Sequence, residues 1–346
     1  MITRYGASRD ELQNLLLNEP RYRVDQVWKG LYTELNAPED MTALPKVLRA
    51  QLVDLLPNSL TLVEEVISDD DTTIKFLWQL DGGSRIETVL MIYPDRATVC
   101  VSTQAGCAMA CGFCATGQAG FTRHLTAGEI VEQVVRASQR AKAMDRRVSN
   151  VVYMGMGEPL ANEEPVWESI VRLHEDVGLS ARHLTVSTVG IIPGINRLAS
   201  RPLPVNLAVS LHAANDNLRD ALVPINRRYP IKALMEACNG FLESKNRRLT
   251  FEWALIDGVN DRPSDAIELA QICRSFRVPA HVNLIPLNPT SGYEVRGSSR
   301  NQVQAFCDQL VGMGANATIR RNRGTDIAAA CGQLAAGQPV QISRSK

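Results

Sequence analysis

The sequence lacks two features that would tie the protein to a membrane or to one class of partner. None of its 346 residues belongs to an apolar run of 18 residues, and residues 1–5 carry no basic-then-apolar signal pattern. Lysine plus arginine equals aspartate plus glutamate at 37 each, so the formal net charge is zero. We therefore expect a cytoplasmic protein without a membrane segment. Net charge alone neither predicts nor excludes binding to nucleic acid.

Composition is that of an ordinary globular protein. Hydrophobic residues make up 45% of the chain and charged residues 21%, and the length suffices for one large domain plus a smaller one. Eight cysteines are present. In a reducing compartment, this many thiols indicate metal binding or catalysis rather than a disulfide scaffold.

Three of the cysteines, Cys107, Cys111 and Cys114, lie at C-x3-C-x2-C spacing among small residues. Iron–sulfur clusters are held by cysteine thiolates, usually four, so three local ligands would leave one iron of a [4Fe–4S] cluster open to another molecule. Structural zinc is an alternative, but it takes four ligands and His124 stands alone nearby. Three inert core thiols are a further alternative. The spacing favours the cluster over both.

Apolar periodicity divides the chain into three parts. Helical spacing marks residues 7–57, and strand-like alternation marks residues 73–80, 86–93 and 97–103. The remainder alternates buried-type strands with amphipathic helices. Its strands are expected at residues 151–154, 184–189, 205–211, 249–256, 282–287 and 317–320, and its helices at 126–144, 163–177, 194–199, 231–242, 264–276 and 300–313.

This strand–helix alternation predicts an α/β fold with a parallel sheet. About six such units favour a barrel, full or partial, because no G-x-G-x-x-G motif follows a strand as in an open dinucleotide-binding sheet. The predicted division is a helical domain at 1–60, a β-rich extension at 61–95 and the barrel at 96–346.

Parallel barrels collect their chemistry at the C-terminal ends of their strands, where several of the expected strands end in polar or glycine-rich residues. The candidate ligand-binding residues at these ends are Gly157, Glu158, Ser187, Ser210, Leu211, His212 and Asn288. Glu158 suits an ammonium group, and hydroxyl, imidazole and amide groups suit ribose, carboxylate or adenine. Each residue taken singly is more often a cap or a turn; as a set at one opening they favour a ligand.

The remaining thiols divide into two kinds. Cys238, Cys273 and Cys307 lie on apolar helix faces, where a free cysteine behaves as a small hydrophobe. Cys331 lies in a segment of small residues after the last strand and has little bulk around it. Cys100 lies on the strand that leads to the three-cysteine loop, where a core role remains open.

The three-cysteine loop, with Phe113 before its last cysteine, resembles the cluster loop of the radical S-adenosylmethionine (SAM) superfamily. Residues 154–159 resemble the motif that contacts the amino group of SAM in that superfamily. The resemblance implies one [4Fe–4S] cluster per chain and SAM as cofactors. In that superfamily, SAM chelates the open iron, and one electron splits SAM into methionine and a 5′-deoxyadenosyl radical.

A narrower resemblance covers nearly the whole chain. The matching stretches are residues 22–28, 107–118, 155–160, 210–212, 283–289 and 329–334. Together they resemble the RlmN/Cfr group of radical SAM RNA methyltransferases, which methylate an unreactive carbon of adenine. The resemblance implies a partial barrel of six βα units with a small N-terminal helical domain. Residues 226–230 and 323–326 resemble the C2-methylating RlmN branch, which acts on 23S rRNA in the peptidyl-transferase region and on the tRNA adenine beside the anticodon.

The group's chemistry implies three roles in this chain. Cys331 would take a methyl group from one SAM, and a second SAM would supply the radical that activates this S-methyl group for addition to adenine C2. Cys100 would attack the Cys331 sulfur, forming a transient disulfide and releasing the methylated RNA. Glu87 would accept the C2 proton. The alternative for Glu87 is an exposed strand carboxylate.

The resemblance also implies partners: 23S rRNA, tRNA, a flavodoxin- or ferredoxin-like electron donor and a disulfide reductant. We expect a monomer. Three alternatives remain open: a C8 methyltransferase of the Cfr branch, a radical SAM enzyme acting on a small molecule, and a non-catalytic RNA-binding protein.

Overall fold

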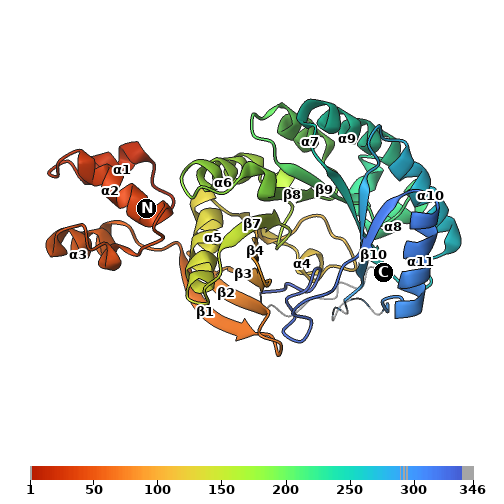
Figure 1. The fold of residues 1–346 in the computed structure, drawn as a ribbon, viewed down its shortest axis with the longest axis horizontal. Helices are drawn as coiled ribbons and strands as arrows, with labels where there is room; N and C mark the ends of the chain where they lie inside the picture. Colours follow the sequence, from red (N-terminus) through yellow and green to blue (C-terminus); the bar gives the residue numbers. More distant parts are fainter. Residues whose placement is uncertain (1, 289, 291–292, 294, 337–346) are drawn as a thin grey trace.

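The computed structural model describes residues 2–288, 290, 293 and 295–336. Within these residues a ten-stranded sheet has the order β1-β2-β3-β4-β7-β8-β9-β10-β11-β12. Neighbouring strands are parallel from β4 to β12 and antiparallel from β1 to β4. Figure 1 shows this sheet curving into a partial barrel with helices outside it and three N-terminal helices at one side.

The N-terminal unit consists of α1 (Arg9–Leu15), α2 (Tyr22–Tyr32), the short 3-10 helix η1 (Pro38–Asp40) and α3 (Lys46–Leu55). Its apolar side chains are too few to form a core alone, and they join the core of the barrel. A hydrogen bond also joins this unit to the barrel: Trp28 Nε1 donates to Oδ1 of Asp176, just beyond α6, at 2.8 Å.

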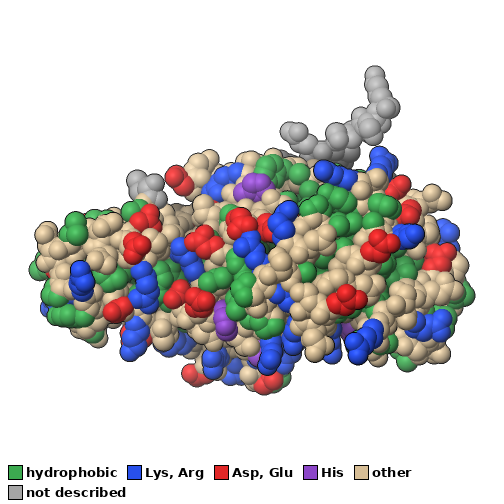
Figure 2. All heavy atoms as spheres, turned by 90° about the horizontal axis from the view of Figure 1, so that it is seen from above, with side chains coloured by type: hydrophobic (Ala, Val, Ile, Leu, Met, Phe, Trp, Pro, Cys, Tyr) green, Lys and Arg blue, Asp and Glu red, His purple; other side chains and the backbone are tan. Residues whose placement is uncertain are grey.

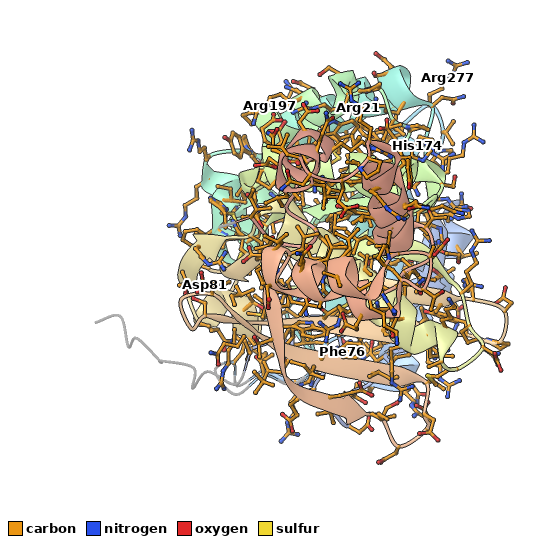
Figure 3. All side chains as sticks on the ribbon, turned by 90° about the vertical axis from the view of Figure 1, so that its left-hand side faces the viewer. Arg21, Phe76, Asp81, His174, Arg197 and Arg277 are labelled. Carbon is orange, nitrogen blue, oxygen red and sulfur yellow. The ribbon has the colours of Figure 1, made fainter. Side chains whose placement is uncertain are left out.

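The antiparallel extension consists of β1 (Leu60–Ile67), β2 (Thr73–Leu80) and β3 (Arg85–Ile92). Apolar periodicity predicted β2 and β3 but not β1. Most side chains of β1 are exposed, so this strand carries no alternating apolar pattern. Figure 3 views the molecule from the side of the N-terminal helices and places the labelled Phe76, from β2, below them.

The barrel follows the predicted alternation. Its strands are β4 (Ala97–Cys100), β7 (Val148–Tyr153), β8 (Leu184–Thr188), β9 (Asn206–Ser210), β10 (Leu249–Leu255), β11 (His281–Pro286) and β12 (Asn316–Ile319). Its main helices are α5 (Ala127–Lys142), α6 (Glu163–Glu175), α7 (Ile192–Ser200), α9 (Ile231–Lys245), α10 (Pro263–Arg274) and α11 (Arg300–Gly312). The helices cover the outer face of the strands, so both faces of the sheet are largely buried.

Four short elements were missed by periodicity. They are β5 (Gln104–Gly106), α4 (Ala115–Gln118), β6 (Phe121–His124) and α8 (Asp216–Leu222). Elements of three to seven residues contain too few turns or alternations to give a periodic signal. The first three surround the three-cysteine loop, so they matter for the site.

The predicted fold class is confirmed: a partial barrel of six βα units with a helical N-terminal unit and a short β extension. The domain boundaries at 60/61 and 95/96 stay a prediction, and residues 337–346 of the last domain lie outside the described residues. Among the helices in the described ranges, none is long and apolar enough to cross a membrane.

A buried carboxylate joins the extension to the barrel. Glu132, on α5 and fully shielded from solvent, accepts hydrogen bonds from the backbone N–H of Ser59 at 2.8 Å and of Leu60 at 3.3 Å. Burial raises the pKa of its carboxyl from 4.5 to about 7, although these N–H groups and Arg136 act in the opposite direction.

We predict that Glu132 makes the protein less stable as pH rises. Between pH 4.5 and about 7 the folded carboxyl binds more protons than the unfolded one, so the unfolding free energy falls across this window. Relative to Glu132→Gln, which cannot titrate, the wild type should lose up to about 3 kcal/mol over the window. Urea unfolding of both proteins at several pH values measures this difference, and parallel stability curves would contradict the prediction.

Candidate active site

The loop that carries Cys107, Cys111 and Cys114 is closed by a small hairpin. Strands β5 and β6 pair antiparallel on either side of it, and the Cys107 N–H donates to the Gly120 carbonyl at 2.7 Å. Gly106 is required here, because its φ is +76° and a Cβ would lie 1.9 Å from the Gly120 oxygen. The loop, residues 107–114, is called the cluster loop below.

The three thiols fit an iron–sulfur cluster better than a single metal ion. All three line one cavity at the C-terminal ends of the barrel strands, called the cofactor cavity below. Burial raises the pKa of Cys107 to about 12, and that of Cys111 also rises, so holding three thiolates here requires a compensating cation. Within the described part of the chain, no three His, Cys, Asp or Glu side chains are arranged to hold one metal ion.

Glu158 forms a preorganised acceptor in the wall of the cofactor cavity. Its Oε1 accepts from the Leu160 N–H at 2.9 Å and its Oε2 from the Val189 N–H at 2.8 Å. Burial raises the pKa of this carboxyl to about 7, so an ammonium group in the cavity would favour its charged form. Gly157 permits the close approach: its φ is +98°, and a Cβ would lie 2.5 Å from Gln104 Cβ.

His212 lies across the same cavity in a left-handed backbone conformation, with φ +59°. Its Nδ1 accepts from the Ala254 N–H at 2.9 Å, so the ring hydrogen lies on Nε2. Burial and the nearby Arg219 lower the pKa of the imidazole to about 3. The ring therefore stays neutral, and it meets Phe113 edge-on with a centroid separation of 4.8 Å.

The other predicted ligand-binding residues divide by position. Ser187 and Ser210 line the cofactor cavity as expected. Leu211 is fully buried outside the lining, and its carbonyl accepts from Arg219 Nε at 3.1 Å. Asn288 lines the cavity, but its Nδ2 donates to the Cys331 carbonyl at 3.1 Å. The SAM-binding role of all four stays a prediction.

Arg219 was missed by the sequence analysis. Its guanidinium is fully buried and also donates to the carbonyls of Val189 at 2.6 Å and Ser210 at 3.3 Å, and to Asn226 Oδ1 at 2.7 Å. The side chain thereby fixes the ends of two neighbouring strands, β8 and β9. An arginine on a short helix, predicted by no motif, gives no sequence signal for this role.

Cys331 lies between two cavities. It lines the cofactor cavity and also a second cavity that contains Cys100, called the thiol cavity below. Cys331 is the only exposed one of the eight cysteines. Burial raises the pKa of the Cys100 thiol to about 12. The two predicted thiols therefore share one cavity.

Glu252 was also missed, as was its pairing with Arg320. They form an ion pair at 3.5 Å inside the barrel; Glu252 borders the cofactor cavity and Arg320 the thiol cavity. Burial raises the pKa of the Glu252 carboxyl. Both residues lie on or beside predicted strands. The alternation of side chains along a strand assigns each residue to one of two faces, but it does not show which face lies inside the barrel.

Glu87 is not the exposed strand carboxylate that the sequence left open. It is buried on β3, where its Oε1 lies 3.0 Å from Lys75 Nζ and its Oε2 accepts from the N–H groups of Ala335 and Ala336. It therefore contacts the chain just after Cys331. Its role as a proton acceptor stays a prediction.

Comparisons with known proteins identify the family. Residues 101–270 match the radical SAM superfamily model. A relative from Chloroflexus aurantiacus, named "Probable dual-specificity RNA methyltransferase RlmN", is 47% identical over 98% of this chain and 94% of its own. A relative of the same name from Frankia casuarinae is 50% identical over 95% of this chain and 81% of its own. This chain belongs to the RlmN family.

A solved structure agrees with the RlmN assignment. A radical SAM methyltransferase from Sphaerobacter thermophilus superimposes with a TM-score of 0.93 at 50% identity, covering 97% of this chain and all of that one. The maturase HydG superimposes with a TM-score of 0.52 at 12% identity over 68% of this chain and 55% of its own, and shares the fold alone. The protein is thus a radical SAM RNA methyltransferase, and its superfamily implies a [4Fe–4S] cluster and SAM.

We predict that removing one cluster-loop thiol prevents cluster binding. Cys111→Ala should lose most of its iron and its visible absorption after anaerobic reconstitution, because a [4Fe–4S] cluster with three protein ligands cannot spare one. Cys238→Ala, which changes a fully buried thiol on α9, is the matched control and should keep its iron. The measurement is the iron and zinc content per chain of both variants. Full iron in Cys111→Ala would refute the ligand set.

We predict that Gly157→Ala weakens SAM binding. A side chain there would strain the backbone and displace Gln104, whose Oε1 accepts from the Glu158 N–H. Strain of this kind should lower SAM affinity at least about tenfold. Gly240→Ala, where a Cβ meets nothing within 4 Å, should bind SAM normally. The measurement is the equilibrium affinity of each reconstituted protein for SAM. Equal affinities of Gly157→Ala and the wild type would contradict the prediction.

Proposed function

We propose that this enzyme methylates C2 of adenine in 23S rRNA, in the peptidyl-transferase region, and in tRNA beside the anticodon. The observation that carries the proposal is the position of Cys331 between the cofactor cavity and the thiol cavity that contains Cys100. A methyl group on Cys331 would face SAM on one side and a resolving thiol on the other. The names of the RlmN relatives support RNA as the substrate.

Each cavity would supply one part of the reaction. Cys107, Cys111 and Cys114 would hold the cluster, and the SAM-binding residues would be Gly157, Glu158, Ser187, Ser210, Leu211, His212 and Asn288. When bound, the cluster supplies the electron that cleaves SAM. Glu158 would bind the ammonium group of SAM, while the neutral His212 offers an N–H to a ribose or adenine acceptor.

The chain's own thiols would carry the methyl group. Cys331 would lose its proton and take a methyl from one SAM. The radical from a second SAM would remove a hydrogen atom from that methyl, the carbon would bond to adenine C2, and the adduct would give up one electron to the bound cluster. Glu87 would accept the C2 proton. The Cys100 thiolate would then attack the Cys331 sulfur, so that an S–S bond forms and the S–C bond breaks. The released carbon would take up a proton, and the RNA would leave with a complete methyl group. An external thiol reductant would supply two electrons to restore both thiols.

RNA contacts would come from local basic residues rather than from net charge. Figure 2 shows basic and acidic side chains interspersed over one face of the molecule, without a large region of one sign. Arg320, Arg321 and Arg323 border the thiol cavity, and in this proposal they would contact phosphates near the entering base. We further propose a cytoplasmic monomer that receives electrons from a flavodoxin- or ferredoxin-like donor.

The decisive experiment uses anaerobically reconstituted enzyme, SAM with a labelled methyl group, and a 23S rRNA fragment or tRNA. Mass spectrometry of the digested RNA should detect 2-methyladenosine from the wild type and none from Cys331→Ala. Cys100→Ala should accumulate an RNA–protein crosslink, because the S–C bond can no longer be cleaved.

Other outcomes distinguish the alternatives. 8-Methyladenosine would keep the chemistry and move the enzyme to the Cfr branch. Cleavage of SAM without label in either RNA would instead indicate a small-molecule substrate. Wild-type methylation that persists in Cys331→Ala would refute the proposed role of that cysteine.

A further inference from the structure

Strand register places four side chains on one face of the sheet beside Cys331. Lys75 on β2 lies opposite Val89 on β3, and Val89 lies opposite Cys100 on β4. Opposed residues share a face, as do residues two apart on one strand, so Glu87 lies on that face too. Val89 and Cys100 line the thiol cavity, so this face of the extension is turned toward the Cys331 segment, residues 324–336.

Lys75 and Glu87 together hold the Cys331 segment on both sides of the cysteine. Lys75 Nζ lies 3.0 Å from Glu87 Oε1 and donates to the Ala328 carbonyl at 3.4 Å. Glu87 Oε2 accepts from the Ala335 N–H at 2.8 Å and from the Ala336 N–H at 3.0 Å. One ion pair thereby contacts the chain three residues before Cys331 and four residues after it.

The surroundings strengthen these contacts. The Lys75 and Glu87 side chains are only 14% and 5% exposed, so water screens the ion pair weakly. Hydrogen bonds from backbone N–H groups to a carboxylate are stronger than those between neutral groups. If Lys75 lost its charge, Glu87 would remain as a buried, uncompensated carboxylate, which is costly. The anchor therefore depends on both members of the pair.

The opposite side of the segment is attached to the barrel. The Ala115 N–H donates to the Gly332 carbonyl at 2.8 Å, Thr116 Oγ1 to the Leu334 carbonyl at 2.6 Å and Asn288 Nδ2 to the Cys331 carbonyl at 3.1 Å. The segment thus spans from helix α4, which follows the cluster loop, to the extension. Its position between the two cavities is set from both sides.

We propose that Lys75 is a positioning residue for Cys331, acting through Glu87 and the backbone of residues 328–336. The proposal rests on the proposed function, in which the Cys331 sulfur carries the methyl group. Lys75 does not line the cofactor cavity, so loss of its charge would change that cavity only where the Cys331 segment borders it, at Cys331 and Gly332. SAM would still be cleaved, but the S-methyl group would be misplaced for adenine, so cleavage and RNA methylation would no longer be coupled.

The test compares Lys75→Met with two controls. Lys75→Arg keeps the positive charge. Glu65→Gln breaks another ion pair of the extension, that between Glu65 on β1 and Arg140 on α5, which does not contact the Cys331 segment. The first measurement is amide hydrogen exchange of residues 332–336 in the full-length protein. Loss of the carboxylate anchor in Lys75→Met should speed exchange at Ala335 and Ala336 at least about tenfold.

The second measurement is the amount of 5′-deoxyadenosine formed per methylated RNA, with SAM affinity determined alongside. Lys75→Met should raise this ratio several-fold at unchanged SAM affinity, whereas Lys75→Arg and Glu65→Gln should resemble the wild type. Wild-type exchange in Lys75→Met would overturn the proposal, and so would faster exchange with an unchanged ratio. If the wild type methylates no RNA, the proposed function fails, while exchange at Ala335 and Ala336 still tests the anchor.

Discussion

The docking of the Cys331 segment into the opening of the barrel is the contact on which the site depends. In the described residues, β4 and β12 end the parallel part of the sheet and do not pair with each other, so the barrel is not closed by hydrogen bonds. The thiol cavity is lined by Cys100 from β4, by Arg320 just after β12 and by Cys331 itself. Figure 1 shows the dark blue C-terminal chain beside α4 and the extension strands. The segment therefore lies where the barrel is not closed, beside Cys100 of β4 and Arg320 just after β12.

This docking joins parts of the chain that are far apart in sequence. The bond from Thr116 Oγ1 to the Leu334 carbonyl spans 218 residues, and that from the Ala336 N–H to Glu87 spans 249. Contacts between residues this far apart in sequence form only once the barrel has assembled. The entropy lost in closing such long loops must be offset by packing in the barrel core. The barrel core forms the rigid support, and the small residues around Cys331 let the backbone approach both walls. Geometry at the thiols is thus a property of the whole fold.

Around the cofactor cavity, three buried polar side chains are hydrogen-bonded within the protein. Glu158 accepts two backbone N–H groups, His212 accepts one, and Arg219 donates to three strand-end carbonyls and to Asn226. Burying these groups without partners would cost several kcal/mol each, on the order of the fold's whole stability. Satisfied in this way, they instead fix the strand ends in the positions that a bound ligand would need. The same interactions therefore stabilise the fold and shape the cavity.

The sequence could predict features that depend on residues close together in the chain. It could not predict contacts that depend on which residues of neighbouring strands lie opposite one another. The cysteine spacing and the βα alternation are local, and the alternation is confirmed. The exposed edge strand β1, the short elements around the cluster loop and the role of Arg219 leave no periodic trace. Glu87 shows the limit most clearly: alternation gives the two faces of β3, but only pairing with β2 and β4 shows that one face carries Lys75, Glu87 and Cys100 together. The extension covers the edge of β4, which would otherwise be an unpaired strand. It also brings the ion pair of Lys75 and Glu87 close to Cys100 and Cys331.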